Sequence, residues 1–183
     1  MTTITVHRPD VEDPPVEPVQ LAPRDRLPQD AHLLLVDNGK AKAKDLLLHI
    51  AHELQQRLPI ATVQVISKPG AGYVLEDAQV AELAGSADLV IAGLGDCGAC
   101  SACSLQDALL FERAGVPATV LITEVFIANV ARFADSLGRP GYHSLVVPHP
   151  AATKTDEQLR GFAAAVADAA VEQLAARQPA AVA

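Results

Sequence analysis

Residues 87–95, ADLVIAGLG, form an apolar run that ends in glycine and leads directly into the segment DCGACSAC at 96–103. The run is apolar without alternation, which is typical of a parallel strand that is buried on both faces. The stretch after the cysteines continues through LLFERAG at 109–115, which ends in the glycine that often follows a helix. We therefore predict a strand, a turn that carries the cysteines, and a helix.

The same alternation of apolar run and amphipathic stretch recurs on both sides of this segment. Further strands are predicted at 32–37, 60–67, 117–123 and 143–150. Helices are predicted at 41–58, 74–85, 125–138 and from about 155 to 177. Because apolar strands alternate with helices, we predict an α/β fold: a single doubly wound, mainly parallel five-stranded sheet with helices on both faces, of the Rossmann or flavodoxin-like class.

Length and composition limit the domain organisation and the function classes. The 183 residues suit one domain, predicted at 31–178, preceded by a flexible, Pro-rich and charged arm at 1–30. A net charge of −8 and an aromatic content of 3% argue against nucleic-acid partners. No segment reaches the roughly 20 apolar residues of a membrane span, and no signal peptide is recognisable. We expect a cytoplasmic protein with no membrane partner.

Polar and reactive side chains follow the predicted strands at their carboxyl ends. Ligands of open parallel sheets bind outside these ends, so we expect the side chains to converge on one edge of the sheet. Cys97 lies at the centre of this edge. Substrate-binding candidates are Asp37, Asn38, Lys40, Lys68, Thr123 and Glu124.

The cysteines of the chain are Cys97, Cys100 and Cys103, each three residues from the next. An odd number confined to one short window indicates a site and not a disulfide framework. At the start of a helix, backbone N–H groups and the macrodipole stabilise a thiolate. We predict that Cys97 is the nucleophile and that Cys100 resolves a disulfide formed on it. Cys103 is an auxiliary thiol that could relay the oxidation or simply pack.

Metal binding is an alternative for the three cysteines. The spacing matches the first three ligands of a bacterial ferredoxin run, with Asp107 at the fourth position, and His149 could instead complete a zinc set. The alternative cofactors are thus an iron–sulfur cluster or zinc on Cys97, Cys100 and Cys103, whereas the thiol interpretation needs no cofactor. Against metal, we interpret Ser104 and Asp107 as a near capping box that begins the following helix.

Two weaker interpretations of this segment depend on its glycines. Gly93, Gly95 and Gly98 formally fit a dinucleotide-binding fingerprint. That fingerprint belongs to the first strand of such folds, and Asp96 would place a negative charge beside a pyrophosphate. The other interpretation is a tight turn that happens to contain small, inert, buried cysteines.

Two titratable residues accompany the thiols in the predicted site. His149 lies between two prolines at the end of the last strand. It could protonate a leaving group or deprotonate Cys97, or it could be a loop histidine that faces solvent. Asp96 could hydrogen-bond the loop amides or act as an acid. Lys40 and Lys68 are expected to bind a substrate carboxylate.

The segment GDCGACSACS at 95–104 resembles the signature of the UGSC family, named for a Sec-Gly-Ser-Cys segment in its selenocysteine-containing members. Cys97 stands at the selenocysteine position and Cys100 at the family's cysteine, whereas Ala99 replaces the usual serine. Similar surroundings extend the resemblance over about residues 32–150. The resemblance implies that Cys97 is a nucleophile and not a structural thiol.

A shorter resemblance links residues 97–103 to the Sec-Gly-Thr-Cys-Thr-Arg-Cys stretch of the substrate-binding component of glycine, sarcosine and betaine reductases. In those enzymes the selenol attacks a substrate bound through a carbonyl adduct, and a C–N bond is cleaved reductively. The resemblance implies reductive chemistry of the same kind here.

These observations together predict a thiol-dependent oxidoreductase or thiol-transfer enzyme, or a subunit of one. Its substrate is expected to be a small carboxylated or carbonyl-containing metabolite, and its chemistry to include reductive cleavage of a C–N or C–S bond. Expected partners are an external thiol reductant or redox protein and further subunits in a homo- or hetero-oligomer. The alternative class is a non-catalytic subunit of a larger enzyme, which suits a small chain without a second domain to close over the site.

Overall fold

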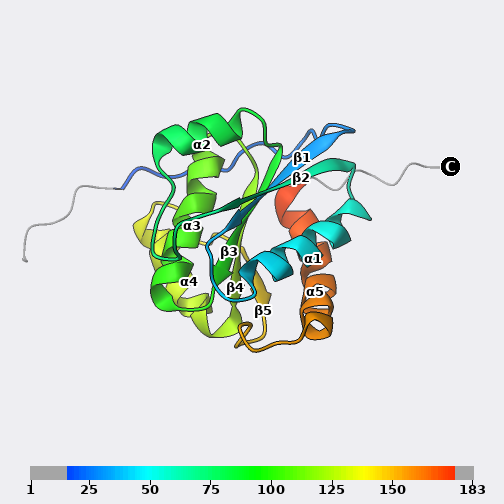
Figure 1. Cartoon of the computed structure of the whole chain (residues 1–183). Coiled ribbons are helices and arrows are strands. Elements are labelled where there is room, and N and C mark those ends of the chain that lie inside the picture. The colour runs from blue at the N-terminus through cyan, green and yellow to red at the C-terminus, as the bar shows by residue number, and fades with distance from the viewer. Residues whose placement is uncertain (1–15, 176–183) are drawn as a thin grey trace, which may run out of the picture.

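The computed structural model describes residues 16–175 as one α/β unit (Figure 1). Its strands are β1 (Ala31–Asp37), β2 (Ile60–Ser67), β3 (Leu89–Gly95), β4 (Ala118–Thr123) and β5 (Ser144–Val147). Its helices are α1 (Ala43–Gln55), α2 (Asp77–Ala84), α3 (Gly98–Arg113), the short 3₁₀ helix η1 (Glu124–Phe126), α4 (Ile127–Ser136) and α5 (Asp156–Leu174).

All five strands are parallel, in the order β2-β1-β3-β4-β5. This confirms the predicted doubly wound fold, and the order is that of flavodoxin-like domains. The chain goes from β1 to β2 on one side and then crosses to β3 on the other. The carboxyl ends of β1 and β3 therefore form the topological switch point at which such sheets bind ligands.

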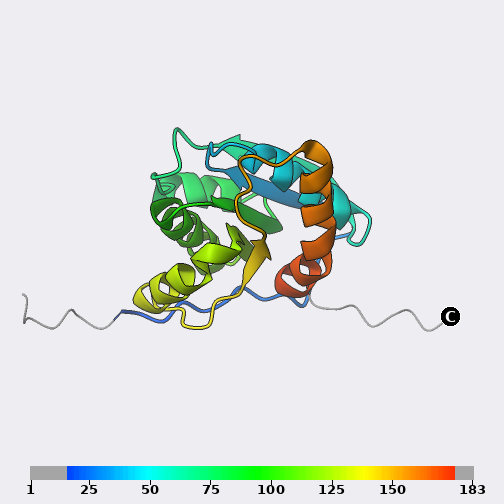
Figure 2. The same cartoon turned by 90° about the horizontal axis from the view of Figure 1, so that it is seen from below.

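Two helical layers cover the sheet, as Figure 2 shows from below. Helices α1 and α5 pack on one face and α2, α3 and α4 on the other. Alternate residues of β1 supply the two cores: Leu33 and Leu35 face α1 and α5, whereas Leu34 and Val36 face the opposite layer. Burial of both faces explains why β3 has no polar side chain and β1 has none between Leu33 and Val36.

The start of α3 differs from the capping-box prediction, which is wrong. The helix begins at Gly98 with Cys97 as its N-cap, so Ser104 and Asp107 lie inside it and are buried. Ser104 accepts a hydrogen bond from Asn38, and Asp107 accepts one from the Leu75 amide at 2.9 Å. Ser104 and Asp107 thus accept hydrogen bonds from neighbouring loops. The local sequence pattern is the same for this role as for helix capping, so it does not distinguish the two.

The part of the predicted arm that the structure describes, residues 16–30, contains no helix or strand but is packed against the domain. Val19 and Ala22 are buried, and the Val19 amide donates to the Gly138 carbonyl at 2.8 Å. Arg24 forms an ion pair with the buried carboxylate of Glu112. These contacts fasten this part of the arm to α3 and to the end of α4. Residues 1–15 of the predicted arm and 176–178 of the predicted domain lie outside the described residues.

None of the helices within residues 16–175 combines the length and the apolar character required to cross a bilayer.

Candidate functional site

Cys97 caps the N-terminus of α3 with its own sulfur. The residue has an extended backbone, and its Sγ accepts a hydrogen bond from the Cys100 amide at 3.2 Å. This replaces the oxygen that a serine or aspartate supplies at most helix N-termini. The side chain is partly exposed, so the sulfur combines the field of a helix N-terminus with access from solvent.

Gly95 lets α3 start close to the sheet. A Cβ at this position would lie 2.7 Å from the Ser101 hydroxyl oxygen and 2.8 Å from a methyl carbon of Ile122, closer than real Cβ contacts allow. The Ser101 hydroxyl in turn donates to the Cys97 carbonyl at 2.6 Å. Gly95 and Ser101 therefore fix the turn that presents Cys97.

Cys100 is fully buried directly behind Cys97. Its thiol donates to the Cys97 carbonyl oxygen at 3.2 Å, and its sulfur accepts from the Asp96 amide at 3.2 Å. Burial raises the pKa of the Cys100 thiol to about 11, and its hydrogen bond with Cys97 adds to the effect. This thiol keeps its proton at neutral pH.

The pKa of Cys97 moves in the opposite direction. Burial opposes ionisation of this thiol and is the largest single effect, but hydrogen bonding with Cys100 and the charge of Lys40 together outweigh it. The net effect is to lower the pKa of Cys97. The first turn of α3 therefore brings together two different thiols: Cys97 favours its thiolate form, and Cys100, three residues later, favours its neutral form.

Lys40 reaches Cys97 from the loop that follows β1. It is partly exposed, and its positive charge helps to lower the pKa of the Cys97 thiol. The sequence predicts that this lysine binds a substrate carboxylate; the structure adds that its charge acts on the nucleophile itself. Lys40 and Cys97 lie on either side of the switch point between β1 and β3.

Asp37 and Asn38, predicted to bind substrate, form hydrogen bonds within the loop at this point. The Asp37 carboxylate accepts from the Gly39 amide at 2.9 Å and from the Ser67 hydroxyl at 2.8 Å. The Asn38 amide group donates to the Leu94 carbonyl at 2.9 Å and accepts from the Lys40 amide at 3.2 Å. Both residues are buried, so their observed contacts position Lys40 and the end of β3.

Lys68 follows β2 at the same edge of the sheet as the thiols, but protein groups bind its ammonium, and its role in binding a substrate carboxylate stays a prediction. Its side chain is buried and pairs with the carboxylate of Asp107 in α3. Its ammonium group also donates to the Tyr73 carbonyl at 2.5 Å. The ammonium is thus committed to holding the loop between β2 and α2 against α3.

Cys103 lies on the next turn of α3 and is partly exposed. Burial raises the pKa of this thiol, Lys68 opposes the increase, and Asp107 adds to it. Cys103 thus has an environment unlike that of Cys97, although the two have the same spacing from Cys100.

His149 and Asp96 form a pair beside the nucleophile. The His149 Nδ1 lies 3.0 Å from the Asp96 carboxylate, and the Thr123 hydroxyl lies 3.1 Å from each of these groups. With Nδ1–H donated to the carboxylate, the lone pair of a neutral imidazole is on Nε2. Within residues 16–175, no hydrogen bond involves that nitrogen, and the ring is about one-third exposed.

Thr123 and Glu124 hold this pair at the end of β4. Thr123 is fully buried and bonds Asp96, His149 and the Gly95 carbonyl. The Glu124 carboxylate accepts from the His149 amide at 3.3 Å, and the Phe126 ring meets the imidazole edge-on. The sequence predicts that Thr123 and Glu124 contact substrate, whereas the contacts observed are to His149 for both and to Asp96 and Gly95 for Thr123.

The three cysteines do not form a metal-binding arrangement. In the part of the chain from 16 to 175, no group of three or more His, Cys, Asp or Glu side chains has the geometry to hold an ion. Cys100 faces inward from α3 and Asp107 is committed to Lys68, so the alternative ligand set is not brought together.

The sequence pattern of the UGSC family matches residues 5–176. The chain belongs to the UGSC family. This confirms the resemblance seen in the cysteine segment and extends it over nearly the whole chain. No match is found among curated proteins.

Two solved structures are similar to this UGSC-family protein. One is a diflavin flavoprotein A3 from Nostoc sp., at 15% identity and a TM-score of 0.39, covering 76% of this chain and 90% of that one. The other is a flavodoxin-like domain of a Synechococcus sp. protein, at 12% identity and a TM-score of 0.39, covering 78% of this chain and 99% of that one.

Proposed function

We propose that this UGSC-family protein is a thiol enzyme in which Cys97 attacks a small carboxylated or carbonyl-containing metabolite and Cys100 resolves the product. The observation that carries the proposal is the opposed tuning of the two thiols: the pKa of Cys97 is lowered and that of Cys100 is raised to about 11. The sulfur of Cys97 is ready to attack as a thiolate, whereas the buried Cys100 thiol next to it stays protonated.

The reaction that fits this pair is a two-electron reductive cleavage. The Cys97 thiolate attacks the carbon of a C–N or C–S bond, a C–S bond to Cys97 forms, and the leaving amine or thiol takes a proton. Cys100 then gives up its proton, attacks the Cys97 sulfur as a thiolate and forms a disulfide, and the released carbanion takes up that proton. The substrate gains two electrons and the thiols lose two, which an external dithiol or redox protein restores.

His149 is the proton carrier in this proposal. Asp96, which directly precedes Cys97, holds the imidazole through Nδ1 and leaves Nε2 for proton transfer. Thr123 and Glu124 position the ring. Lys40 supports the Cys97 thiolate before attack and offers a positive charge to a substrate carboxylate. The positive charge of Lys40 thus favours an anionic substrate.

Trapping of the covalent intermediate tests the proposal. The Cys100→Ser variant lacks the resolving thiol, so incubation with candidate carboxylated and carbonyl metabolites should accumulate an adduct on Cys97, seen by mass spectrometry of the intact chain and its peptides. The unsubstituted protein should instead convert to a Cys97–Cys100 disulfide. Cys103→Ser in the Cys100→Ser background is the matched control and should still trap. An adduct distributed equally over Cys97 and Cys103 would contradict the proposed roles.

A further inference from the structure

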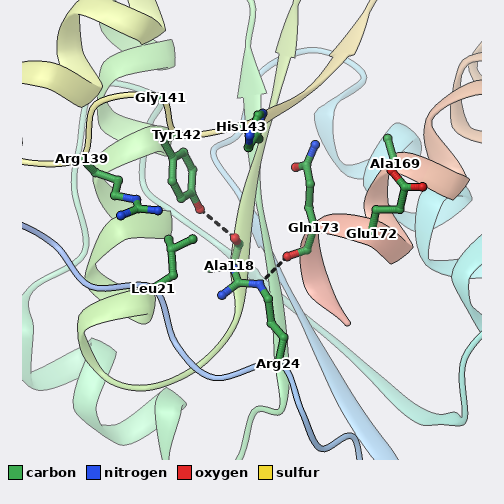
Figure 3. Close-up of a pocket in the computed structure, with 10 residues that line it drawn as sticks. All are labelled: Leu21, Arg24, Ala118, Arg139, Gly141, Tyr142, His143, Ala169, Glu172 and Gln173. Carbon is green, nitrogen blue, oxygen red and sulfur yellow. Dashed lines mark hydrogen bonds between the residues drawn. The ribbon is translucent and has the colours of Figure 1, made fainter. Parts of the chain in front are cut away.

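A cavity of about 490 Å³ opens at the edge of the sheet opposite the thiols (Figure 3). It lies at the amino ends of β4 and β5, where Ala118 begins β4 and His143 precedes β5. The six residues of β4 span about 20 Å at 3.3 Å per residue, so a ligand here would not reach Cys97. The cavity is therefore separate from the site described above, and its volume is within the usual range of small-molecule sites.

Part of the cavity wall is apolar and rigidly held. Leu21 of the arm, Ala118 and Ala169 of α5 contribute carbon surface, and the Tyr142 ring stands beside them. The Tyr142 hydroxyl donates to the Ala118 carbonyl at 2.7 Å, and burial raises the pKa of this phenol, so the hydroxyl stays protonated and bonded. The ring is thereby fixed as a wall for an apolar group.

Most of the charged groups around the cavity are engaged. Arg24 donates to the Gln173 carbonyl at 2.6 Å, as the dashed line in Figure 3 marks, and pairs with the carboxylate of Glu112. Glu172 lines the cavity and has interactions of its own, and His143 is exposed. The carboxylate of Glu112 therefore already balances the charge of Arg24.

Arg139 differs from Arg24 in this respect. Its Nε is buried without a hydrogen-bond acceptor, and its Nη1 has only a 3.5 Å contact with the Val19 carbonyl. Within residues 16–175, no carboxylate forms an ion pair with it. A guanidinium without a carboxylate partner binds carboxylate and phosphate oxygens well.

We propose that this cavity binds a small molecule in which a carboxylate or phosphate is joined to an apolar body. The oxyanion pairs with Arg139, and the apolar body lies against Leu21, Ala169 and the Tyr142 ring. Because these walls come from the arm, α5 and the loop before β5, the ligand would hold the three segments together.

Calorimetric titration of the full chain with simple probes tests the chemistry. Phenylacetate and phenyl phosphate carry both features, acetate and inorganic phosphate only the charge, and 2-phenylethanol only the apolar body. We expect one or both of the first two to bind at least about tenfold more tightly than the other three. Their relative affinities distinguish a carboxylate site from a phosphate site. Equal binding of 2-phenylethanol, or no binding of any probe, would overturn the proposal.

Two variants with matched controls locate the site. Arg139→Gln should weaken the tighter probe by at least about tenfold, whereas Arg132→Gln, an exposed position of α4, should not. Ala169→Leu fills the cavity and keeps Arg139, so it should also abolish binding, whereas Ala164→Leu on the exposed side of α5 should not. Melting curves without ligand show whether each variant is folded. If neither Arg139→Gln nor Ala169→Leu changes the affinity of the probe, the probe binds elsewhere and this cavity is not its site.

Discussion

The amide of Cys100 donates to the sulfur of Cys97, while the thiol of Cys100 donates to the Cys97 carbonyl, each at 3.2 Å. Two cysteines on one helical turn thus stabilise opposite protonation states of each other. The Cys97 sulfur gains donors that favour a thiolate, and Cys100 gains an acceptor that retains its proton. This relationship leads to the first prediction.

The three thiols should react with iodoacetamide in the order Cys97, Cys103, Cys100. Because the thiolate is the reacting form, the Cys97 rate should rise with pH and level off below the ordinary range of a free thiol, as its lowered pKa requires. Cys100 should stay unmodified until the pH approaches about 11. Peptide mass spectrometry over a pH series measures the three rates. In denaturant they should become similar, and a folded-state order led by Cys103 would refute the assignment.

Replacement of Lys40 should slow Cys97. Lys40→Gln removes the charge and the donor near the sulfur, which raises the pKa of Cys97 and lowers its thiolate fraction at neutral pH. We expect alkylation at pH 7 to slow by about threefold to tenfold, which corresponds to a shift of up to about one pKa unit. Lys44→Gln, an exposed position of α1, is the control. Equal rates in the two variants would mean that Lys40 does not act on the nucleophile.

Removal of the Asp96 carboxylate should change the tautomer of His149. In the unsubstituted protein the proton of the neutral ring is expected on Nδ1, which faces that carboxylate at 3.0 Å. Asp96→Ala should move a substantial fraction of it to Nε2, the form favoured by a free imidazole. Nitrogen NMR of the imidazole distinguishes the two forms, with exposed His143 as an internal reference. If the nitrogen spectrum of His149 is the same in Asp96→Ala as in the unsubstituted protein, Asp96 does not orient the ring.

Lys68 should be important for stability and not for reactivity at Cys97. Lys68→Met leaves the buried carboxylate of Asp107 without its partner and should lower the free energy of unfolding by about 3–5 kcal/mol. The double variant Lys68→Met, Asp107→Leu removes both charges and should recover part of this loss. Denaturant unfolding measures both values, and Cys97 alkylation in the folded fraction should stay normal. A stable Lys68→Met variant would exclude the proposed structural role.

A methyl group at Gly95 should disturb the start of α3. The Cβ of Gly95→Ala would overlap the Ser101 hydroxyl and Ile122, so we expect a destabilisation of about 1–3 kcal/mol. The displaced helix start should also slow Cys97 alkylation. Gly72→Ala, where a Cβ meets nothing within 4 Å, is the control in an unfolding experiment. Equal stability of the two variants would show that the close approach is not required.

The sheet is predictable from the sequence because a strand that is buried on both faces appears locally as an uninterrupted apolar run. Leu33–Val36 and Leu89–Ala92 are apolar without a break, as expected of strands in a parallel sheet that is covered on both faces. The cysteine turn is predicted for a similar reason, since it directly follows a strand at a sheet edge. The influence of Lys40 on Cys97 fits the same strand order, since β1 and β3 are neighbours.

The roles of the buried polar residues could not be predicted in this way. Lys68 and Asp107 are 39 positions apart, and neither has a local pattern that indicates the other. Thr123 and Glu124 lie at the predicted edge, but their partner His149 arrives from a strand end 25 residues later. Sequence position indicates which edge a polar side chain occupies, whereas the tertiary fold determines whether it faces solvent or a neighbour.

The carboxylate of Glu112 accepts from the Ala22 amide at 2.6 Å and from the Ala118 amide at 2.9 Å, besides its ion pair with Arg24. A shortened chain that starts at residue 31 would lose two of these three partners. It would also uncover the surface beneath Val19 and leave a buried negative charge without its counter-ion. The unit that folds independently is therefore expected to begin before Val19, and truncations or N-terminal fusions should retain residues 16–30.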